Sequence, residues 1–284
     1  MRPLQHRARG AVGPAGGAPR ARRAPPRAAV AGVAAPGDLV LVAGASGGVG
    51  QLVTAKLLDR GYRVRALTRD PAKAATLFSG APGLETATGD TRTPPTLVAA
   101  LDGVSAFACC TGTTAFPSAR WFGGNGPKAT DDEGVKNLVA AAAASPSLKR
   151  FILVSSAGVD RADKPPYSIL NLFGVLTSKK AGEAALLASG IPSTLLRPGR
   201  LTDGPYTSYD LNTLLRATGD DKRGVGVARG DTLDGQTSRV AVAEAVVQCL
   251  TLACTEGAAL SLESTPGTEG PGKDAGAWER LLCG

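Results

Sequence analysis

From residue 38 onward, short apolar segments alternate along the chain with longer segments of helical character. Several of the apolar segments are unbroken, as expected for strands that are buried on both faces. The predicted strands cover residues 39–44, 63–69, 84–90, 104–112, 150–156, 193–199 and 259–264. The predicted helices follow the first strand up to residue 60, begin again after residue 71, and then cover 93–103, 133–145, a stretch ending near 189, 240–253 and 275–283.

Strands that alternate with helices predict a parallel sheet covered on both faces, which is the doubly wound α/β architecture. The length of 284 residues suits one large domain, and we expect one, from residue 38 to residue 284. The connection over residues 113–132 is much longer than the usual ~2 to 6 residues, which is typical of a lid over a site. Its aromatic residues Phe116, Trp121 and Phe122 either cover a flat ligand or anchor the loop to the core.

The first 37 residues differ sharply in composition from the rest. They contain seven of the 32 basic residues and no Asp or Glu, so the remaining chain carries 25 basic against 24 acidic residues. Such a segment cannot bury enough apolar surface to offset its ordering entropy, so we interpret it as a plastid transit peptide, with a disordered basic tail as the alternative. The nearly neutral body argues against nucleic-acid binding, and no later stretch has the about 18 apolar residues of a membrane span.

The cysteines do not predict a metal site. There are five of them, and none is spaced for metal binding with a histidine, because His6, the only one, lies in the N-terminal segment. The adjacent Cys109 and Cys110 are expected to fill the small-residue end of a buried strand, and the alternative is a redox-active pair.

The sharpest motif is GASGGVG at residues 44–50, directly after the first strand and at the start of the first helix. In that position glycines are typical of a dinucleotide-binding turn. Gly44 permits the tight turn, Gly47 lets a pyrophosphate approach the backbone and the helix dipole, and Gly50 lets the helix pack close to the sheet. The residues of this motif predicted to bind the cofactor are Gly44, Ser46, Gly47, Gly48, Val49 and Gly50.

The ends of the next strands bear on the choice of nucleotide. Arg69 ends the second strand and offers a forked, permanently charged partner for a 2′-phosphate, which favours NADP(H) over NAD(H). The alternative is that Arg69 is solvated and Asp70 binds the ribose. Asp90, after the third strand, is expected near the adenine amino group, and Thr111 and Gly112, at the end of the fourth strand, are expected to contact the cofactor.

Together these motifs resemble the atypical short-chain dehydrogenases/reductases of the NmrA-like, NAD(P)-binding type. The resemblance is strongest to the plastid branch of plants and algae, a group that includes the NAD(P)-binding part of an inner-envelope translocon subunit. It is carried by GASGGVG, TRD, TGD, DEGVKNLVAAA, FILVSSAGV, NLFGVLTSKKAGEAALLASGI and LLRPGRLTDGPY. It implies a single Rossmann-like domain with a small substrate region near the C-terminus, and NADP(H) as the cofactor.

The resemblance also implies roles for individual residues. Orthodox members carry Tyr-x-x-x-Lys after the fifth strand, and the SKKAGE stretch places the lysine at Lys179 and the tyrosine position at Val175. Ser156, with Ser155 beside it, matches the serine that orients the substrate. Lys179 and Glu183, four residues apart, are also typical of a solvated helix face. Pro198 and Gly199, after the sixth strand, are expected to form the wall beside the nicotinamide.

The absent tyrosine leaves two functions open. Loss of a general acid typically costs ~10²- to 10⁴-fold in rate, so we expect hydride transfer to a small flat acceptor, flavin- or quinone-like, that needs little proton assistance. The alternative is a non-catalytic module that senses NADP(H) and docks peripherally on a plastid membrane complex. The sequence does not name the substrate. Substitute proton donors to test are Tyr167, Tyr206 and Tyr209.

Overall fold

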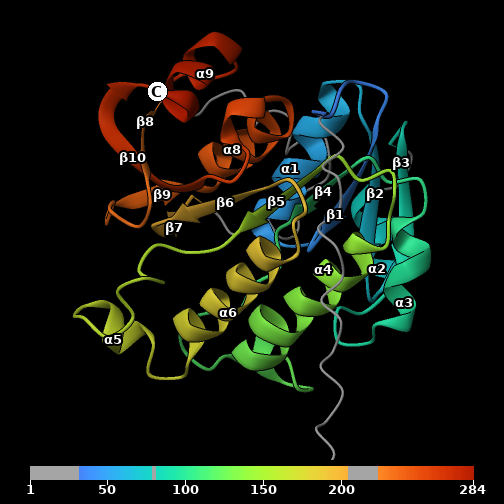
Figure 1. Ribbon diagram of the computed structural model, residues 1–284, viewed down its shortest axis with the longest axis horizontal. Coiled ribbons are helices and arrows are strands. Elements are labelled where there is room, and N and C mark those ends of the chain that lie inside the picture. The colour runs from blue at the N-terminus through green and yellow to red at the C-terminus, as the bar shows by residue number, and fades with distance from the viewer. Residues whose placement is uncertain (1–31, 79–80, 204–222) are drawn as a thin grey trace, which may run out of the picture.

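An eight-stranded sheet runs through the centre of the computed structural model, which describes residues 32–78, 81–203 and 223–284 (Figure 1). The strand order is β3-β2-β1-β4-β5-β6-β10-β8. Neighbouring strands are parallel except β8, which pairs antiparallel with β10 at the edge. The strands are β1 Leu39–Ala43, β2 Arg63–Thr68, β3 Leu84–Thr88, β4 Ala106–Cys109, β5 Arg150–Val154, β6 Ser193–Pro198, β8 Arg223–Arg229 and β10 Ala259–Glu269.

Helices cover both faces of this sheet (Figure 1). Alternate residues of β1 point to opposite faces, so Val40 and Val42 pack in a core with α1, α2, α8 and α9, whereas Leu39, Leu41 and Ala43 pack in a second core with α3, α4 and α6. These helices are α1 Gly48–Asp59, α2 Pro71–Phe78, α3 Pro95–Val98, α4 Gly134–Ala143, α6 Val175–Ala188, α8 Arg239–Thr251 and α9 Ala275–Cys283. The predicted doubly wound α/β class is therefore confirmed.

A buried ion-pair network joins α1 to α8. Glu244 accepts from Lys56 Nζ at 2.8 Å and from Arg60 Nη2 at 2.5 Å. The side chains of Lys56 and Glu244 are each 2% exposed. The helix that follows the glycine turn is thus fixed to its neighbour by charge as well as by apolar packing.

The structure adds elements that the sequence pattern did not predict. Besides the edge strand β8, a small parallel pair is formed by β7 (Arg200–Thr202) and β9 (Gln236–Ser238), and a short helix α5 covers Tyr167–Leu170. A π-helix, η3 (Lys128–Glu133), runs directly into α4, so the end of the predicted 113–132 loop is helical. Short 3-10 turns are η1 Ala99–Leu101, η2 Ala119–Trp121 and η4 Ala253–Thr255.

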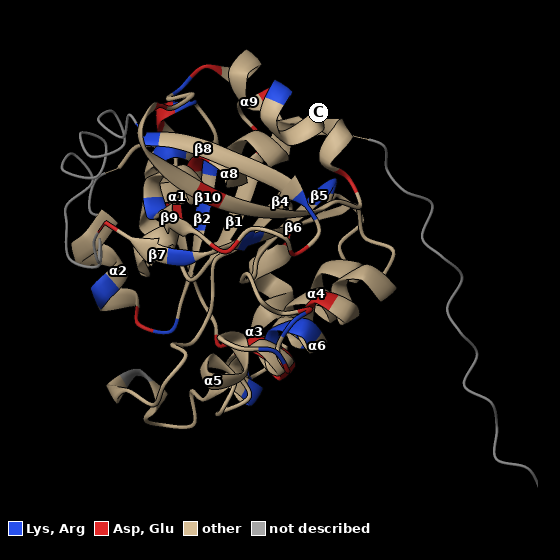
Figure 2. Ribbon diagram, turned by 90° about the vertical axis from the view of Figure 1, so that its left-hand side faces the viewer, with Lys and Arg blue, Asp and Glu red and all other residues tan. Residues whose placement is uncertain are grey.

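The remaining sequence predictions concern charge, cysteines and the N-terminal segment. Basic and acidic residues are interspersed over the described part of the chain (Figure 2). Cys109 is buried and Cys110 is half-buried, whereas Cys254 and Cys283 form a disulfide that the sequence did not predict. Residues 1–31 of the segment interpreted as a transit peptide lie outside the described residues. None of the helices in the described ranges is long and apolar enough to cross a membrane.

Candidate functional site

A cleft of about 500 Å³ lies at the carboxyl ends of β1, β2 and β4. The strand order reverses between β1 and β4, and the loops that follow these two strands diverge there, which is where doubly wound proteins bind ligands. The predicted cofactor residues that line this cleft are Gly44, Ser46, Gly47, Arg69, Thr111 and Gly112. The predicted residues that lie outside its lining are Gly48, Val49, Gly50, Asp90, Lys179, Pro198 and Gly199.

Two glycines of the turn between β1 and α1, Gly44 and Gly50, have no room for a side chain. Gly44 has a φ of +76°, in the left-handed region, and an added Cβ would lie 2.8 Å from the Cys110 carbonyl. A Cβ on Gly50 would lie 2.1 Å from the Gly44 oxygen, so the start of α1 packs directly on the turn. Gly48 and Val49 are the first two residues of α1, and Val49 is buried in the core.

The N-terminus of α1 has the features of an anion site. Gly47 is the N-cap residue of α1, and glycine has no side chain that could cap the helix. No side chain therefore bonds the first backbone N–H groups of α1. These donors and the positive end of the helix dipole favour a negatively charged group. The glycine turn and the uncapped start of α1 therefore fit a dinucleotide pyrophosphate.

Basic side chains gather where β2 and β3 end. Arg69, Lys73 and Arg92 all line the cleft. Arg92 forms an ion pair with Asp90, at 2.6 Å between Nη2 and Oδ2, and these hydrogen bonds hold the pKa of Asp90 below its ordinary value. The carboxylate predicted to lie near the adenine is thus engaged by its neighbour, while Asp70 accepts from the Lys73 backbone N–H at 3.0 Å.

Lys179 is held by a carboxylate on a neighbouring helix. Its Nζ lies 2.7 Å from Asp131 Oδ1, and the two side chains are 11% and 2% exposed. Asp131 also accepts from the Thr113 hydroxyl and, at 3.2 Å, from the Thr113 N–H. A Cβ on Gly112 would lie 3.0 Å from Lys179 Nζ, so the ammonium group sits directly behind the cleft lining. Glu183, in contrast, is 1% exposed and does not form the solvated pair considered above.

The two serines after β5 have different surroundings. Ser155 is buried and its Oγ has no hydrogen-bond partner, beside a small void that Thr111, Asp131 and Lys179 also line. Ser156 is half-buried and donates to the Ala157 carbonyl at 3.0 Å. The position of the orthodox tyrosine is filled by a buried aliphatic residue.

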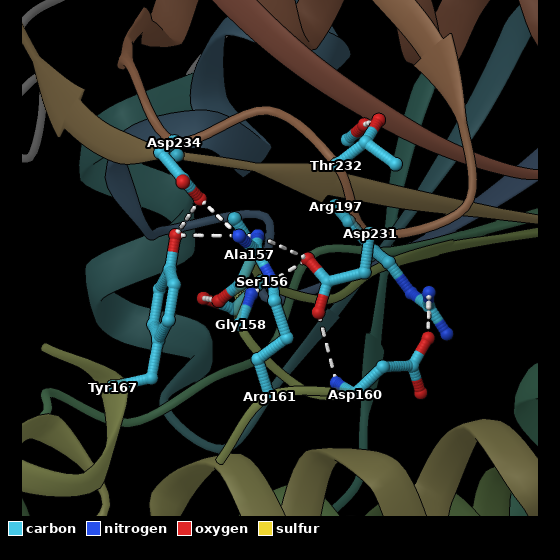
Figure 3. A network of polar contacts seen from close by, with 12 residues as sticks. Ser156, Ala157, Gly158, Asp160, Arg161, Tyr167, Arg197, Asp231, Thr232 and Asp234 are labelled. Atoms are coloured by element: carbon cyan, nitrogen blue, oxygen red, sulfur yellow. Dashed lines mark hydrogen bonds and ion pairs between the residues drawn. The ribbon is translucent and has the colours of Figure 1, made fainter. Parts of the chain in front are cut away.

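That residue, Val175, is 4% exposed and packs with Val159, Tyr167 and Leu176. Tyr167 is itself part of a polar network (Figure 3). Its hydroxyl donates to Asp234 at 2.6 Å, and burial is the main cause that raises its pKa to about 12. Tyr167 therefore keeps its proton throughout the neutral range. The other two tyrosines considered as substitutes, Tyr206 and Tyr209, lie outside the described residues.

Asp231 ties the turn after β5 to the loop before β9. Its carboxylate accepts from the N–H groups of Gly158 at 2.7 Å and Asp160 at 2.8 Å, and from Arg161 at 3.1 Å (Figure 3). A Cβ on Gly158 would clash with the ring of Tyr167, which packs against the turn. The network thus fixes the segment that carries Ser156.

The end of β6 is fixed in a similar way. Arg197 is buried and its guanidinium pairs with Glu183 and Asp160, each at 2.6 Å. Pro198 is buried, and a Cβ on Gly199 would lie 1.9 Å from the Gly235 oxygen, so only glycine permits this close approach. Gly199 therefore packs against the β9 side of the fold, whereas Pro198 pairs with Leu262 of β10.

Sequence reasoning missed Asp131 and Asp231. Asp131 lies in an acidic stretch that opens a helix, where Asp and Glu are common for reasons of helix stability alone. Asp231 follows the edge strand β8, which was itself not predicted. Neither residue carries a local signal, because both act on segments that are distant in sequence.

The family model for NAD(P)H-binding proteins matches residues 44–252, which begins at the glycine turn and ends just after α8. The chain belongs to the NAD(P)H-binding family. Within this family it is 36% identical over 224 residues to the chloroplastic protein TIC 62 of Pisum sativum, and the match covers 73% of this chain and 39% of that protein. It is 30% identical over 161 residues to an NAD(P)H azoreductase of Xenophilus azovorans, with 57% and 48% covered.

The family relationship confirms the predicted resemblance to the plastid branch of atypical short-chain reductases. Further plant relatives are also chloroplastic proteins, which confirms the predicted plastid location. Among solved structures, an oxidoreductase from Lactococcus lactis is similar in fold, with a TM-score of 0.66, 19% identity, and coverage of 86% of this chain and 96% of that one. The chain spans less than half the length of the two named relatives.

Proposed function

We propose that the protein binds NADP(H) in the cleft beside β1 and transfers hydride to a small, flat acceptor of the flavin or quinone type. The observation that carries the NADP(H) part is the cationic side chain at the end of β2. Arg69 lines the cleft and forms no ion pair with a carboxylate among the described residues. A guanidinium that is not held in an ion pair at this position favours a 2′-phosphate.

The remaining cofactor contacts follow from the cleft. Gly44 and Gly47 would hold the pyrophosphate at the start of α1, and Thr111 and Gly112 would lie along the nucleotide. Lys179, behind Gly112, would hold the nicotinamide ribose. Bound NADPH would supply the hydride, which is the difficult part of the chemistry.

The nature of the acceptor follows from what surrounds the reacting position. Val175 cannot donate a proton, and the Tyr167 hydroxyl is engaged in a hydrogen bond to Asp234, with a raised pKa that makes it a weaker acid than an ordinary tyrosine. Ser156 would orient the acceptor. An acceptor that takes hydride into a conjugated ring suits this site, because such a ring delocalises the charge it gains. The azoreductase among the relatives acts, by its name, on another conjugated group.

A second function is favoured by the pairing of Lys179. Its ammonium is already neutralised by Asp131 at 2.7 Å, so the site offers little net charge to a reacting group. The protein would then hold NADP(H) as a sensor of the redox state and associate peripherally with a plastid membrane complex, without turnover. This alternative keeps every nucleotide contact of the first.

The two functions differ in one experiment. NADPH oxidation is followed at 340 nm with FMN, a benzoquinone or no acceptor, using the wild-type protein and the Ser156→Ala variant. The reductase predicts acceptor-dependent oxidation that falls at least tenfold in Ser156→Ala. Tight NADPH binding, with no oxidation above the rate for NADPH and acceptor without protein, would reject hydride transfer and support the sensor.

A further inference from the structure

Arg69 contacts a neutral partner across the cleft. Its Nη1 donates to Asn125 Oδ1 at 2.5 Å, and Asn125 belongs to the loop between β4 and η3. The other end of the same amide is engaged, because Asn125 Nδ2 donates to the Phe122 carbonyl at 2.5 Å. The Asn125 backbone N–H donates to the Trp121 backbone carbonyl at 3.1 Å. The amide oxygen therefore faces Arg69 with an orientation that is fixed from within the loop.

The second arginine of the cleft has a different partner. Arg92 pairs with the Asp90 carboxylate at 2.6 Å and donates from Nη1 to the Gly123 carbonyl at 2.6 Å. The pKa of Asp90 is lowered first by its hydrogen bonds from Arg92, and the charge of Arg69 is the last of the contributing causes. Arg92 is thus compensated by a carboxylate, whereas Arg69 is oriented by an amide that carries no charge.

We infer that Asn125 is a positioning residue that sets selectivity for the 2′-phosphate by holding the Arg69 guanidinium at the cleft without neutralising it. The inference rests on the proposed binding of NADP(H). A guanidinium carries five N–H donors in a planar fork, so one donor bound to Asn125 leaves others for a phosphate. The loop would therefore contribute to recognition although it follows β4 rather than β2.

The chemical group at position 125 determines how each substitution changes the affinity for NADPH. Removing the amide frees an exposed, flexible arginine, whose ordering must then be supplied by the ligand, and immobilising one such side chain corresponds to about a three- to tenfold loss in affinity. A carboxylate at the same position would still hold Arg69 but would compensate its charge and repel the phosphate. Asn125→Asp is therefore expected to weaken NADPH binding more than Asn125→Ala does.

The test is a set of NADPH and NADH titrations by cofactor fluorescence on the full chain. The proteins are wild type, Asn125→Ala, Asn125→Asp, Arg69→Ala and the double variant Arg69→Ala/Asn125→Ala. Thr114→Ala is the matched control, because Thr114 accepts from the Trp121 indole within the same loop and does not line the cleft. Thermal unfolding of each variant checks that it is folded.

The inference predicts that Asn125→Ala raises the Kd for NADPH about three- to tenfold and that Asn125→Asp raises it further, while the Kd for NADH stays within about twofold. In the Arg69→Ala background, Asn125→Ala should have no further effect, and Thr114→Ala should change neither Kd. Equal weakening of NADPH and NADH in Asn125→Ala would overturn the inference, as would an unchanged Kd for NADPH in Asn125→Asp.

The titrations separate the role of Asn125 from the binding of NADP(H) itself. A wild-type protein that prefers NADPH, and loses that preference in Arg69→Ala but not in either Asn125 variant, would overturn only the role of Asn125. A wild-type protein that binds NADH as tightly as NADPH would overturn both.

Discussion

Lys179 Nζ lies 2.7 Å from Asp131 Oδ1, in a contact between α6 and the π-helix that precedes α4. The lysine that in orthodox relatives assists a tyrosine is here paired with a carboxylate. Close packing makes the contact possible, because a Cβ on Gly182 of α6 would lie 2.5 Å from the Asp131 carbonyl oxygen. The pair sits behind Gly112, so it couples the cleft to the packing of two helices.

Substitution of Asp131 should destabilise the fold. Asp131→Ala leaves a mostly buried ammonium without its partner, which is expected to lower the free energy of unfolding by about 3 kcal/mol. Glu133→Ala is the matched control, because Glu133 pairs with Lys128 at 3.7 Å on the exposed side of the same helix and should cost less than about 1 kcal/mol. Urea unfolding measures both.

The double variant Asp131→Ala/Lys179→Met removes the unpaired charge and should recover most of the lost stability. If Asp131→Ala proves no more harmful than Glu133→Ala, the buried pair does not support the fold in the way described.

The position of the missing tyrosine gives a gain-of-function prediction. Val175→Tyr should add NADPH-dependent reduction of a simple aldehyde, by roughly 10²-fold over wild type, because it returns a proton donor one helical turn before Lys179. Val175→Phe adds the same bulk without the hydroxyl and should show no gain. Stopped-time product analysis of the three proteins compares them, and equal rates for the tyrosine and phenylalanine variants would show that proton supply is not what limits carbonyl reduction.

The extent to which the sequence predicted this molecule depends on the range of the interactions involved. The strands β1, β2, β4, β5 and β6 were predicted because each carries buried apolar residues between turns, whereas β3 (LETAT) is mostly polar and gave a weaker signal. The edge strand β8 was not, because Gly224 and Gly226 interrupt its apolar residues, and its place is set by pairing with β10. The first turn, from Gly44 to Gly50, is a local motif, so its position was readable from the chain alone.

The polar partners of the site were not readable in the same way. Asp131 with Lys179 and Asn125 with Arg69 are separated by 48 and 56 residues, and no local pattern connects them. Their contacts depend on how η3 and the preceding loop pack against distant elements. The roles predicted for Lys179 and Arg69 came from motif and strand position, whereas the groups that hold their side chains required the structure.

The free energy of unfolding should depend on pH through Glu244. Burial alone would raise the pKa of this carboxyl, but the charges of Lys56 and Arg60 bring it below its ordinary value of 4.5. The stabilisation is therefore fully present above that value and is lost as the pH falls through the folded-state pKa. Glu244→Gln should lower the free energy of unfolding by about 3 kcal/mol at pH 7, because it leaves buried cations uncompensated.

The difference between wild type and Glu244→Gln should begin to shrink as the pH falls below 4.5, and it should vanish below the lower folded-state pKa, where Glu244 is neutral in the folded protein as well. Urea unfolding from pH 7 to pH 3 measures this. A difference that stays constant over the whole range would mean that the charge of Glu244 does not stabilise the contact between α1 and α8.

The most direct test of the central claim is the ratio of the dissociation constants of NADH and NADPH, measured by fluorescence titration on wild type, Arg69→Ala and Arg63→Ala. Arg63 is an exposed arginine at the opposite end of β2 and serves as the control. We predict that wild type binds NADPH at least tenfold more tightly than NADH, that Arg69→Ala brings the ratio close to one, and that Arg63→Ala leaves it unchanged. Equal binding of the two nucleotides by the wild-type protein would contradict the account.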